Sequence, residues 1–321
     1  MSSTTTPTTA SMNAQADKAP PQDPYWSRTA SQWSAAPRED PVVWGANQGP
    51  LSSDELAAFE RDGFRFEPQL VESSEAAELA EEAWRMAKSA RTGQAGVVFE
   101  PPNANSAGPV VRSLFRVHQT SSRLRQICHQ ERIVGIARQI LGSDVYLHQS
   151  RINFKPALDG KEFFWHSDFE TWHIEDGMPR MRAVSLSLNL TENHEFNGPL
   201  MVIPGSHHHY VRCVGHTPEN HFQQSLQKQQ YGVPDREALE MLVEQGGIAA
   251  PKGPPGSGLF FECNLMHGSN GNMSPQPRVN LFLVFNSLEN PLREPYGSMP
   301  PRPDFLGERH PVPIKELADE S

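Results

Sequence analysis

Between residues 145 and 155 the chain reads Val145-Tyr-Leu-His-Gln-Ser-Arg-Ile-Asn-Phe-Lys155, and its polar side chains recur at every second position. Alternate residues of a strand point to opposite faces, so one face carries Gln149, Arg151, Asn153 and Lys155. The same period recurs over residues 182–190 and 278–286, and two shorter strands are indicated over residues 198–204 and 257–264. Short strands separated by Gly and Pro turns predict a β-sandwich or a jelly roll.

The polar faces of these strands carry Gln, Asn, Arg and Ser, and few of the Lys and Glu residues that are usual on a solvated surface. An ordinary antiparallel sheet would turn such faces to water, and this interpretation stays open for any single strand. We favour faces that line an interior cavity, with the preceding helices covering the aliphatic faces.

Helix signals precede most of the strands. Ser52-Ser-Asp-Glu55 opens a short amphipathic segment that ends at Gly63. The apolar spacing predicts further helices over residues 73 to about 91, 122–141 and 235–245.

The chain of 321 residues can bury a large core, and we expect a single domain over residues 23–321. Its expected parts are an extended arm (23–50), a mainly helical support (51–142), the jelly-roll core (143–290) and a C-terminal extension (291–321). The aromatic residues of the arm suggest that it lies on the domain surface; they are Tyr25, Trp26, Trp33 and Trp44. Residues 1–22 have few large apolar side chains and are expected to be disordered.

Charge, apolar stretches and cysteine content bear on the binding partners and the cellular compartment. The formal net charge is -10, from 28 basic and 38 acidic residues, which argues against nucleic acid or an anionic membrane as a partner. No stretch has the apolar length of a membrane helix, and the N-terminus has no apolar signal region. Cys128, Cys213 and Cys263 are odd in number and lack metal-type spacing, which favours reduced thiols in a cytoplasm.

The run Phe163-Phe-Trp-His-Ser-Asp-Phe-Glu-Thr-Trp172 contains a His-x-Asp motif. On an extended segment, the side chains of His166 and Asp168 would project from the same face. His267 would complete two histidines and one carboxylate, the facial triad of non-haem Fe(II) oxygenases, although a lone histidine at that place is more often structural. Arg278, which begins the next strand, offers a planar guanidinium for a carboxylate. This order is typical of iron- and 2-oxoglutarate-dependent oxygenases.

Two longer segments carry a family resemblance. Asn197-Gly-Pro-Leu-Met-Val-Ile-Pro-Gly-Ser-His207 resembles a loop of the phytanoyl-CoA dioxygenase superfamily. It also fits a plain turn, and residues 207–209 could form a separate histidine metal tract; we favour the turn because no carboxylate lies beside it. Residues 163–183 resemble the signature of the ectoine hydroxylases within that superfamily. This resemblance extends over Asp40-Pro-Val-Val-Trp-Gly45, residues 149–155 and Arg278-Val-Asn-Leu-Phe282.

The resemblance implies a mainly β fold, a double-stranded β-helix (cupin-type jelly roll) with helices on the outer face of one sheet. It implies Fe(II)- and 2-oxoglutarate-dependent hydroxylation of ectoine to 5-hydroxyectoine with O2, releasing succinate and CO2, by a cytoplasmic homodimer that serves the osmotic stress response. The implied iron ligands are His166, Asp168 and His267. The implied 2-oxoglutarate contacts are Asn153, Lys155, Phe163, Ser269, Arg278 and Asn280. The implied ectoine contacts are Gln149, Arg151, Trp172, Ala183, Phe261 and Phe282.

The chemistry of ectoine suits the last set, because aromatic faces attract its delocalised amidinium and Arg151 and Gln149 can meet its carboxylate. Asp168 argues against a halogenase, which would need a small residue there to admit halide. Three alternatives stay open: a related hydroxylase of another small amino acid derivative, a zinc hydrolase with the same three ligands, and a non-catalytic cupin-like solute-binding module.

Overall fold

The structure, a computed structural model, describes residues 23–29, 31–45, 48–100, 108–219, 222–226 and 231–317. The tail over residues 1–22, for which the sequence predicts disorder, lies outside these residues. Within the described part of the chain, no helix is both long and apolar enough to cross a membrane.

A large antiparallel sheet of seven strands organises the molecule. The three long strands expected from the period of two form its centre, in the order β7-β12-β5, so these predictions are confirmed. The strands, in sheet order, are β2 (Phe64–Glu67), β10 (Gly258–Glu262), β7 (Ala183–Asn189), β12 (Arg278–Ser287), β5 (Val145–Lys155), β4 (Val111–Phe115) and β3 (Val97–Phe99).

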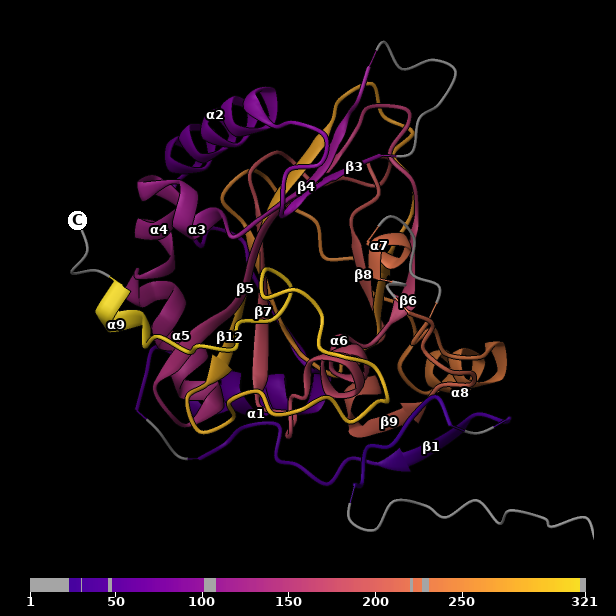
Figure 1. The fold of residues 1–321 in the computed structure, drawn as a ribbon. Helices are drawn as coiled ribbons and strands as arrows, with labels where there is room; N and C mark the ends of the chain where they lie inside the picture. Colours follow the sequence, from indigo (N-terminus) through magenta and orange to yellow (C-terminus); the bar gives the residue numbers. More distant parts are fainter. Residues whose placement is uncertain are drawn as a thin grey trace, which may run out of the picture.

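A smaller sheet lies on one side of the large sheet, and the helices within residues 73–141 lie on the other side (Figure 1). Its order is β6 (Phe163–His166), β11 (His267–Ser269) and β8 (Leu200–Val202). A separate pair joins β1 (Ser34–Pro37) to β9 (His209–Arg212). Two facing antiparallel sheets with helices outside one of them form the expected cupin-type jelly roll.

Helices cover the outer face of the large sheet (Figure 1). Helix α1 begins with a capping box between Ser52 and Glu55 and ends at Gly63, whose φ of 78° suits a glycine. The helices are α1 (Ser53–Asp62), α2 (Ser73–Ser89), α3 (Val117–Thr120), α4 (Ser122–Cys128), α5 (Glu131–Leu141), α6 (Asp168–Thr171), α7 (Phe222–Ser225), α8 (Arg236–Gly246) and α9 (Ile314–Leu317).

The single helix predicted over residues 122–141 is wrong, because the chain forms two helices there. Gln130 takes an extended conformation, with φ -64° and ψ 124°, and caps a new helix. Leu124 of α4 and Ile133 of α5, on either side of this break, both join the core. Apolar spacing continues across the break and therefore could not reveal it.

The two faces of the large sheet are used as expected. The aliphatic face packs against α2, α4 and α5, and includes Ile152, Leu186 and Leu281, each with no exposed surface. Burying such a side chain contributes about 1.5–3 kcal/mol relative to leaving it exposed. The polar face is also buried, with Lys155 only 6% exposed and Asn280 fully covered. This excludes the ordinary sheet that turns its polar face to water.

The N-terminal arm penetrates the molecule, so the expectation of a surface position is wrong for its first residues. Tyr25 is buried, its hydroxyl donates to Asp40 at 2.9 Å, and its ring centroid lies 5.1 Å from that of Phe169. The tyrosine ring supplies a large apolar area and its hydroxyl finds a buried acceptor, which explains why it is held inside.

Candidate metal centre and adjoining cavity

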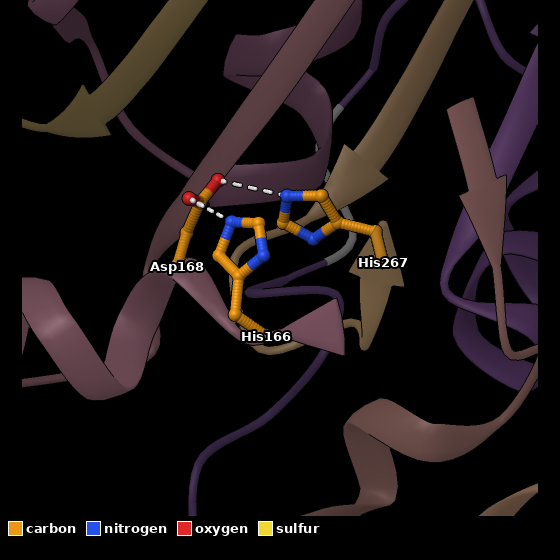
Figure 2. A group of neighbouring side chains, drawn as sticks. All are labelled: His166, Asp168 and His267. Carbon is orange, nitrogen blue, oxygen red and sulfur yellow. Dashed lines mark ion pairs between the residues drawn. The ribbon is translucent and has the colours of Figure 1, made fainter. Parts of the chain in front are cut away.

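Two strands and one helix bring the three predicted ligands together (Figure 2). His166 ends β6, His267 begins β11, and the two residues are direct partners in the antiparallel ladder. The Nε2 atom of His166 lies 3.7 Å from Asp168 Oδ1, and that of His267 lies 3.9 Å from Asp168 Oδ2. All three side chains are buried, and their ligand atoms lie within 4.8 Å of one another.

Backbone carbonyls fix the orientation of both imidazole rings. The Nδ1 atom of His166 lies 2.8 Å from the carbonyl oxygen of Phe164, and that of His267 lies 2.9 Å from the carbonyl oxygen of Leu265. A carbonyl can only accept, so Nδ1 carries a proton in each ring, and in a neutral ring Nε2 then keeps the lone pair. Both Nε2 atoms face the carboxylate, which is the arrangement of metal-binding histidines.

Asp168 reaches the site in a different way from the one expected. The sequence predicts that His166 and Asp168 share the face of one strand, but β6 ends at His166 and Asp168 is the first residue of α6. Ser167 between them caps the helix by accepting from the backbone N–H of Glu170. The residues converge as predicted, whereas the reason given for it is wrong.

The donor set suits a divalent metal ion. Burial opposes ionisation of Asp168, but His267 and His166 outweigh burial and hold the pKa of this carboxyl well below its usual range. Burial, followed by the nearby His166, lowers the pKa of His267 to about 4, so its imidazole is neutral. Asp168 Oδ2 is buried without a hydrogen-bond partner. A buried carboxylate oxygen beside the Nε2 atoms of two imidazoles fits a cation such as Fe(II).

The triad lies at the wall of a cavity between the two sheets. Twelve of the predicted site residues line it: Gln149, Arg151, Asn153, Lys155, Phe163, His166, Asp168, Trp172, His267, Ser269, Arg278 and Phe282. The other three, Ala183, Phe261 and Asn280, are buried behind the lining. Of these, Phe261 packs on His267 with ring centroids 4.9 Å apart, and Asn280 donates to Ser187 and Asn189. Their direct contacts with ligands stay predictions.

One end of the cavity is cationic. Arg278 donates to the carbonyl oxygen of Gly198, while its Nε is buried without a partner. Lys155 donates to Ser269 Oγ at 2.8 Å and to the carbonyl oxygen of Asn270. Arg112, which sequence reasoning missed, also lines this end and pairs with Glu100 at 2.8 Å. The uncompensated charges make this end a receptor for an anion.

The other end combines aromatic rings with a second arginine. The guanidinium carbon of Arg151 lies 4.8 Å from the ring centroid of Phe282, and Arg151 Nη1 donates to Gln149 Oε1 at 2.5 Å. Burial lowers the pKa of Arg151. Trp172 lies on the same cavity and packs edge-on against His148, with ring centroids 4.9 Å apart. A carboxylate and a delocalised cation could both be accommodated here.

The C-terminal extension supplies lining residues that sequence reasoning did not select. Arg302 makes a bidentate pair with Asp176, at 2.9 and 2.5 Å, and reaches the cavity. Leu306 also lines it, and its carbonyl accepts from Gln149 at 2.8 Å. No local motif marks either residue, because their position depends on how the extension folds back over the jelly roll.

The histidine tract at residues 207–209 lies apart from the triad, and His207 Nε2 lies 3.0 Å from the carbonyl of Glu60.

Comparisons with known proteins agree with this geometry. A model of the phytanoyl-CoA dioxygenase (PhyH) family matches residues 59–280. The ectoine dioxygenase of Bordetella bronchiseptica is 50% identical over 292 residues, which cover 90% of this chain and 94% of that protein. The ectoine dioxygenase of Halomonas elongata is 49% identical over 291 residues, covering 89% and 86%. The crystal structure of EctD from S. alaskensis with 2-oxoglutarate and 5-hydroxyectoine superposes with a TM-score of 0.80 at 43% identity, covering 92% and 98%. A crystal structure of the same protein with bound Fe also gives a TM-score of 0.80, with 91% and 97% covered.

Proposed function

The chain belongs to the ectoine dioxygenases of the phytanoyl-CoA dioxygenase family, and we propose that it hydroxylates ectoine to 5-hydroxyectoine. The reaction consumes 2-oxoglutarate and O2 and releases succinate and CO2. The observation that carries this proposal is one cavity with a two-histidine, one-carboxylate triad at its wall and unpaired cations at one end. Iron bound by His166, Asp168 and His267 supplies the oxidising chemistry when 2-oxoglutarate and O2 are present.

Lys155 and Arg278 hold the 2-oxoglutarate dianion in this proposal. Both lie at the cationic end, and Ser269 and Asn153 offer neutral hydrogen bonds beside them. Phe163 covers this end and lies under Arg112, whose guanidinium carbon is 5.7 Å from the ring centroid. The site then neutralises two carboxylates within a buried space, where charge-assisted hydrogen bonds are strong.

Trp172, Phe282 and Arg151 hold ectoine. Aromatic faces attract the ring amidinium by about 0.5–2 kcal/mol each, depending on desolvation. Arg151 and Gln149, already hydrogen-bonded to each other, present donors to the carboxylate. Two opposite interactions on one small zwitterion fix its orientation, and the protein thereby places one ring carbon beside the metal centre and excludes water.

The proposal also covers the oligomeric state, the cellular compartment and the physiological role. The resemblance to ectoine hydroxylases supports a cytoplasmic homodimer that acts in the osmotic stress response. Cys128, Cys213 and Cys263 are buried and unpaired, as expected in a reducing compartment. Light scattering of the purified protein tests the dimer.

Product analysis tests the reaction. Purified protein is incubated aerobically with Fe(II), 2-oxoglutarate and ectoine, and with proline or lysine in place of ectoine. We expect 5-hydroxyectoine and succinate in equal amounts with ectoine alone. Turnover of another amino acid derivative in its place would indicate a related hydroxylase. Activity with zinc and without 2-oxoglutarate would indicate a hydrolase, and tight ectoine binding without succinate would indicate a binding module.

A further inference from the structure

We infer that Arg28 of the N-terminal arm positions the metal ligand Asp168 and the substrate-facing Trp172 by clamping the helix junction between them. The inference rests on the proposed function for the roles of these two residues. It concerns a side chain that lies outside the cavity and 142 positions from Glu170.

The junction joins two short helices of different type. Asp168 begins α6, and Trp172 begins η1 (Trp172–Asp176), which is a π-helix. A π-helical turn is rare and is frequently found at functional sites. The direction of Trp172 relative to Asp168 therefore depends on the angle at which the second helix leaves the first.

The guanidinium of Arg28 binds both sides of this junction. Its Nε and Nη2 donate to Glu170 of α6 at 2.9 and 2.6 Å, and its Nη1 donates to Glu175 of η1 at 2.5 Å. A further bond from Nη2, at 3.2 Å, reaches the hydroxyl of Thr171 at the junction itself. Nη1 also donates to Thr217 at 3.0 Å, so all five donors of the guanidinium are used.

The pairing is sealed from water. The side chains of Arg28, Glu170 and Glu175 are 2%, 1% and 3% exposed. Gly232 closes over the pair, since a Cβ there would lie 2.3 Å from Glu170 Oε2 and 2.7 Å from Arg28 Nη2. Among the described residues, Arg302 contacts only Glu175 of these two carboxylates, so the loss of Arg28 would leave the buried Glu170 without an ion-pair partner.

Neighbouring residues of the N-terminal arm also hold the two helices of the junction. Ser27 donates to Glu170 at 2.7 Å, and a carboxylate oxygen of Asp23 lies 3.0 Å from Nε2 of His173 in the π-helix. On the opposite side, Arg302 pairs with Asp176 and lies 3.6 Å from Glu175. The junction is thus held between the two ends of the described chain, with Glu175 contacted from both sides.

The position of the clamp predicts a selective effect. Lys155 and Arg278, at the 2-oxoglutarate end of the cavity, lie on β5 and β12 and make no recorded contact with Arg28 or its two carboxylates. Loosening the junction should displace Trp172 and Asp168 while leaving the cationic end in place. Ectoine turnover should then suffer more than 2-oxoglutarate binding.

The test compares Arg28→Met with Arg38→Met. Arg38 belongs to the same arm and has an equally buried side chain, but it pairs with Glu262 of β10 at 2.9 Å and has no hydrogen bond or ion pair to the described residues of α6 or η1. We expect Arg28→Met to lower kcat by about 10- to 100-fold and to raise the KM for ectoine about tenfold, with the KM for 2-oxoglutarate within about twofold of wild type. Arg38→Met should lower thermal stability and leave both KM values within about twofold of wild type.

A second readout needs neither metal nor substrate. Hydrogen exchange on the metal-free proteins should show faster exchange of amides over residues 168–178 in Arg28→Met than in Arg38→Met or wild type. This result separates the clamp from the proposed substrate, because it holds whatever molecule the cavity binds. If Arg28→Met proves insoluble, Arg28→Lys serves: it keeps the charge but cannot span both carboxylates, and it should retain part of the effect.

Unchanged exchange over residues 168–178, with wild-type ectoine kinetics in a folded Arg28 variant, would overturn the inference. So would equal rises in both KM values, or the same selective change in Arg38→Met, since either would indicate general destabilisation. If the wild-type protein is inactive on ectoine, but Arg28→Met still shows faster amide exchange over residues 168–178 than wild type, the result counts against the proposed function alone.

Discussion

Lys155 and Arg278 lie directly opposite each other in the ladder between β5 and β12, with no carboxylate of the described residues in an ion pair with either. Burial, followed by the nearby Arg278, lowers the pKa of Lys155 to about 6. Burial, followed by Arg112, lowers the pKa of Arg278 to about 10. Two cations held together against their own repulsion are stabilised when a dianion binds between them.

Arg278→Ala should raise the KM for 2-oxoglutarate by about 10- to 100-fold, because a hydrogen bond to a charged group contributes about 1.5–3 kcal/mol. The KM for ectoine should change little. Steady-state kinetics with each substrate varied in turn measures both values. A wild-type KM for 2-oxoglutarate in this variant would refute the proposed contact between Arg278 and the 2-oxoglutarate carboxylate.

Binding of 2-oxoglutarate should weaken as the pH rises above about 6. Without ligand, Lys155 loses its proton near this pH, whereas the bound dianion favours the protonated amine. Binding above the free pKa therefore takes up a proton, and the affinity falls by up to about tenfold per pH unit until the pKa of the complex is reached.

Anaerobic calorimetry in buffers of different ionisation enthalpy counts the protons taken up. The Lys155→Met variant should bind more weakly at low pH and show a flatter pH profile. Wild-type protein that binds 2-oxoglutarate without any proton uptake between about pH 6 and 8 would contradict this prediction.

His166→Ala and Asp168→Ala should each abolish turnover, with a loss of at least about 100-fold, because each removes one of the three proposed metal ligands. His208→Ala is a matched histidine control, since its ring lies near the Arg61 carbonyl and away from the triad. Anaerobic Fe(II) titration in the presence of 2-oxoglutarate should give a charge-transfer band only in wild type and the control. A normal band in His166→Ala would remove that residue from the ligand set.

Trp172→Ala should mainly weaken ectoine binding, by about 0.5–2 kcal/mol for the lost cation–π contact, which corresponds to about 2- to 30-fold in affinity. Trp172→Phe should fall between this variant and wild type. Trp33→Phe is a control, because Trp33 donates to Glu237 far from the cavity lining. Calorimetry with the iron- and 2-oxoglutarate-loaded protein measures the ectoine affinity of each variant. An unchanged affinity in Trp172→Ala would show that Trp172 does not bind ectoine.

The central strands were predictable because polar and apolar residues alternate along a strand whose two faces have different surroundings, and this alternation can be seen in a short stretch of sequence. Residues 145–155 show it along their whole length, and β5 has these same bounds. Short strands such as β3 and β11, with three residues each, offer too few positions for a period to be seen. The break at Gln130 was hidden for a related reason, since apolar spacing that continues across a break does not report it.

Sequence by itself determined which side chains form the candidate metal centre, because only a few residue types bind iron and their order along the chain is distinctive. Tertiary structure decided how they converge: ladder pairing places His267 against His166, and a helix start, not a shared strand face, aims Asp168. It also decided that Arg28 and Arg302, from opposite ends of the described chain, both hold the segment after Asp168. Contacts between residues more than a hundred positions apart depend on the packing of the whole molecule, and no local pattern encodes them.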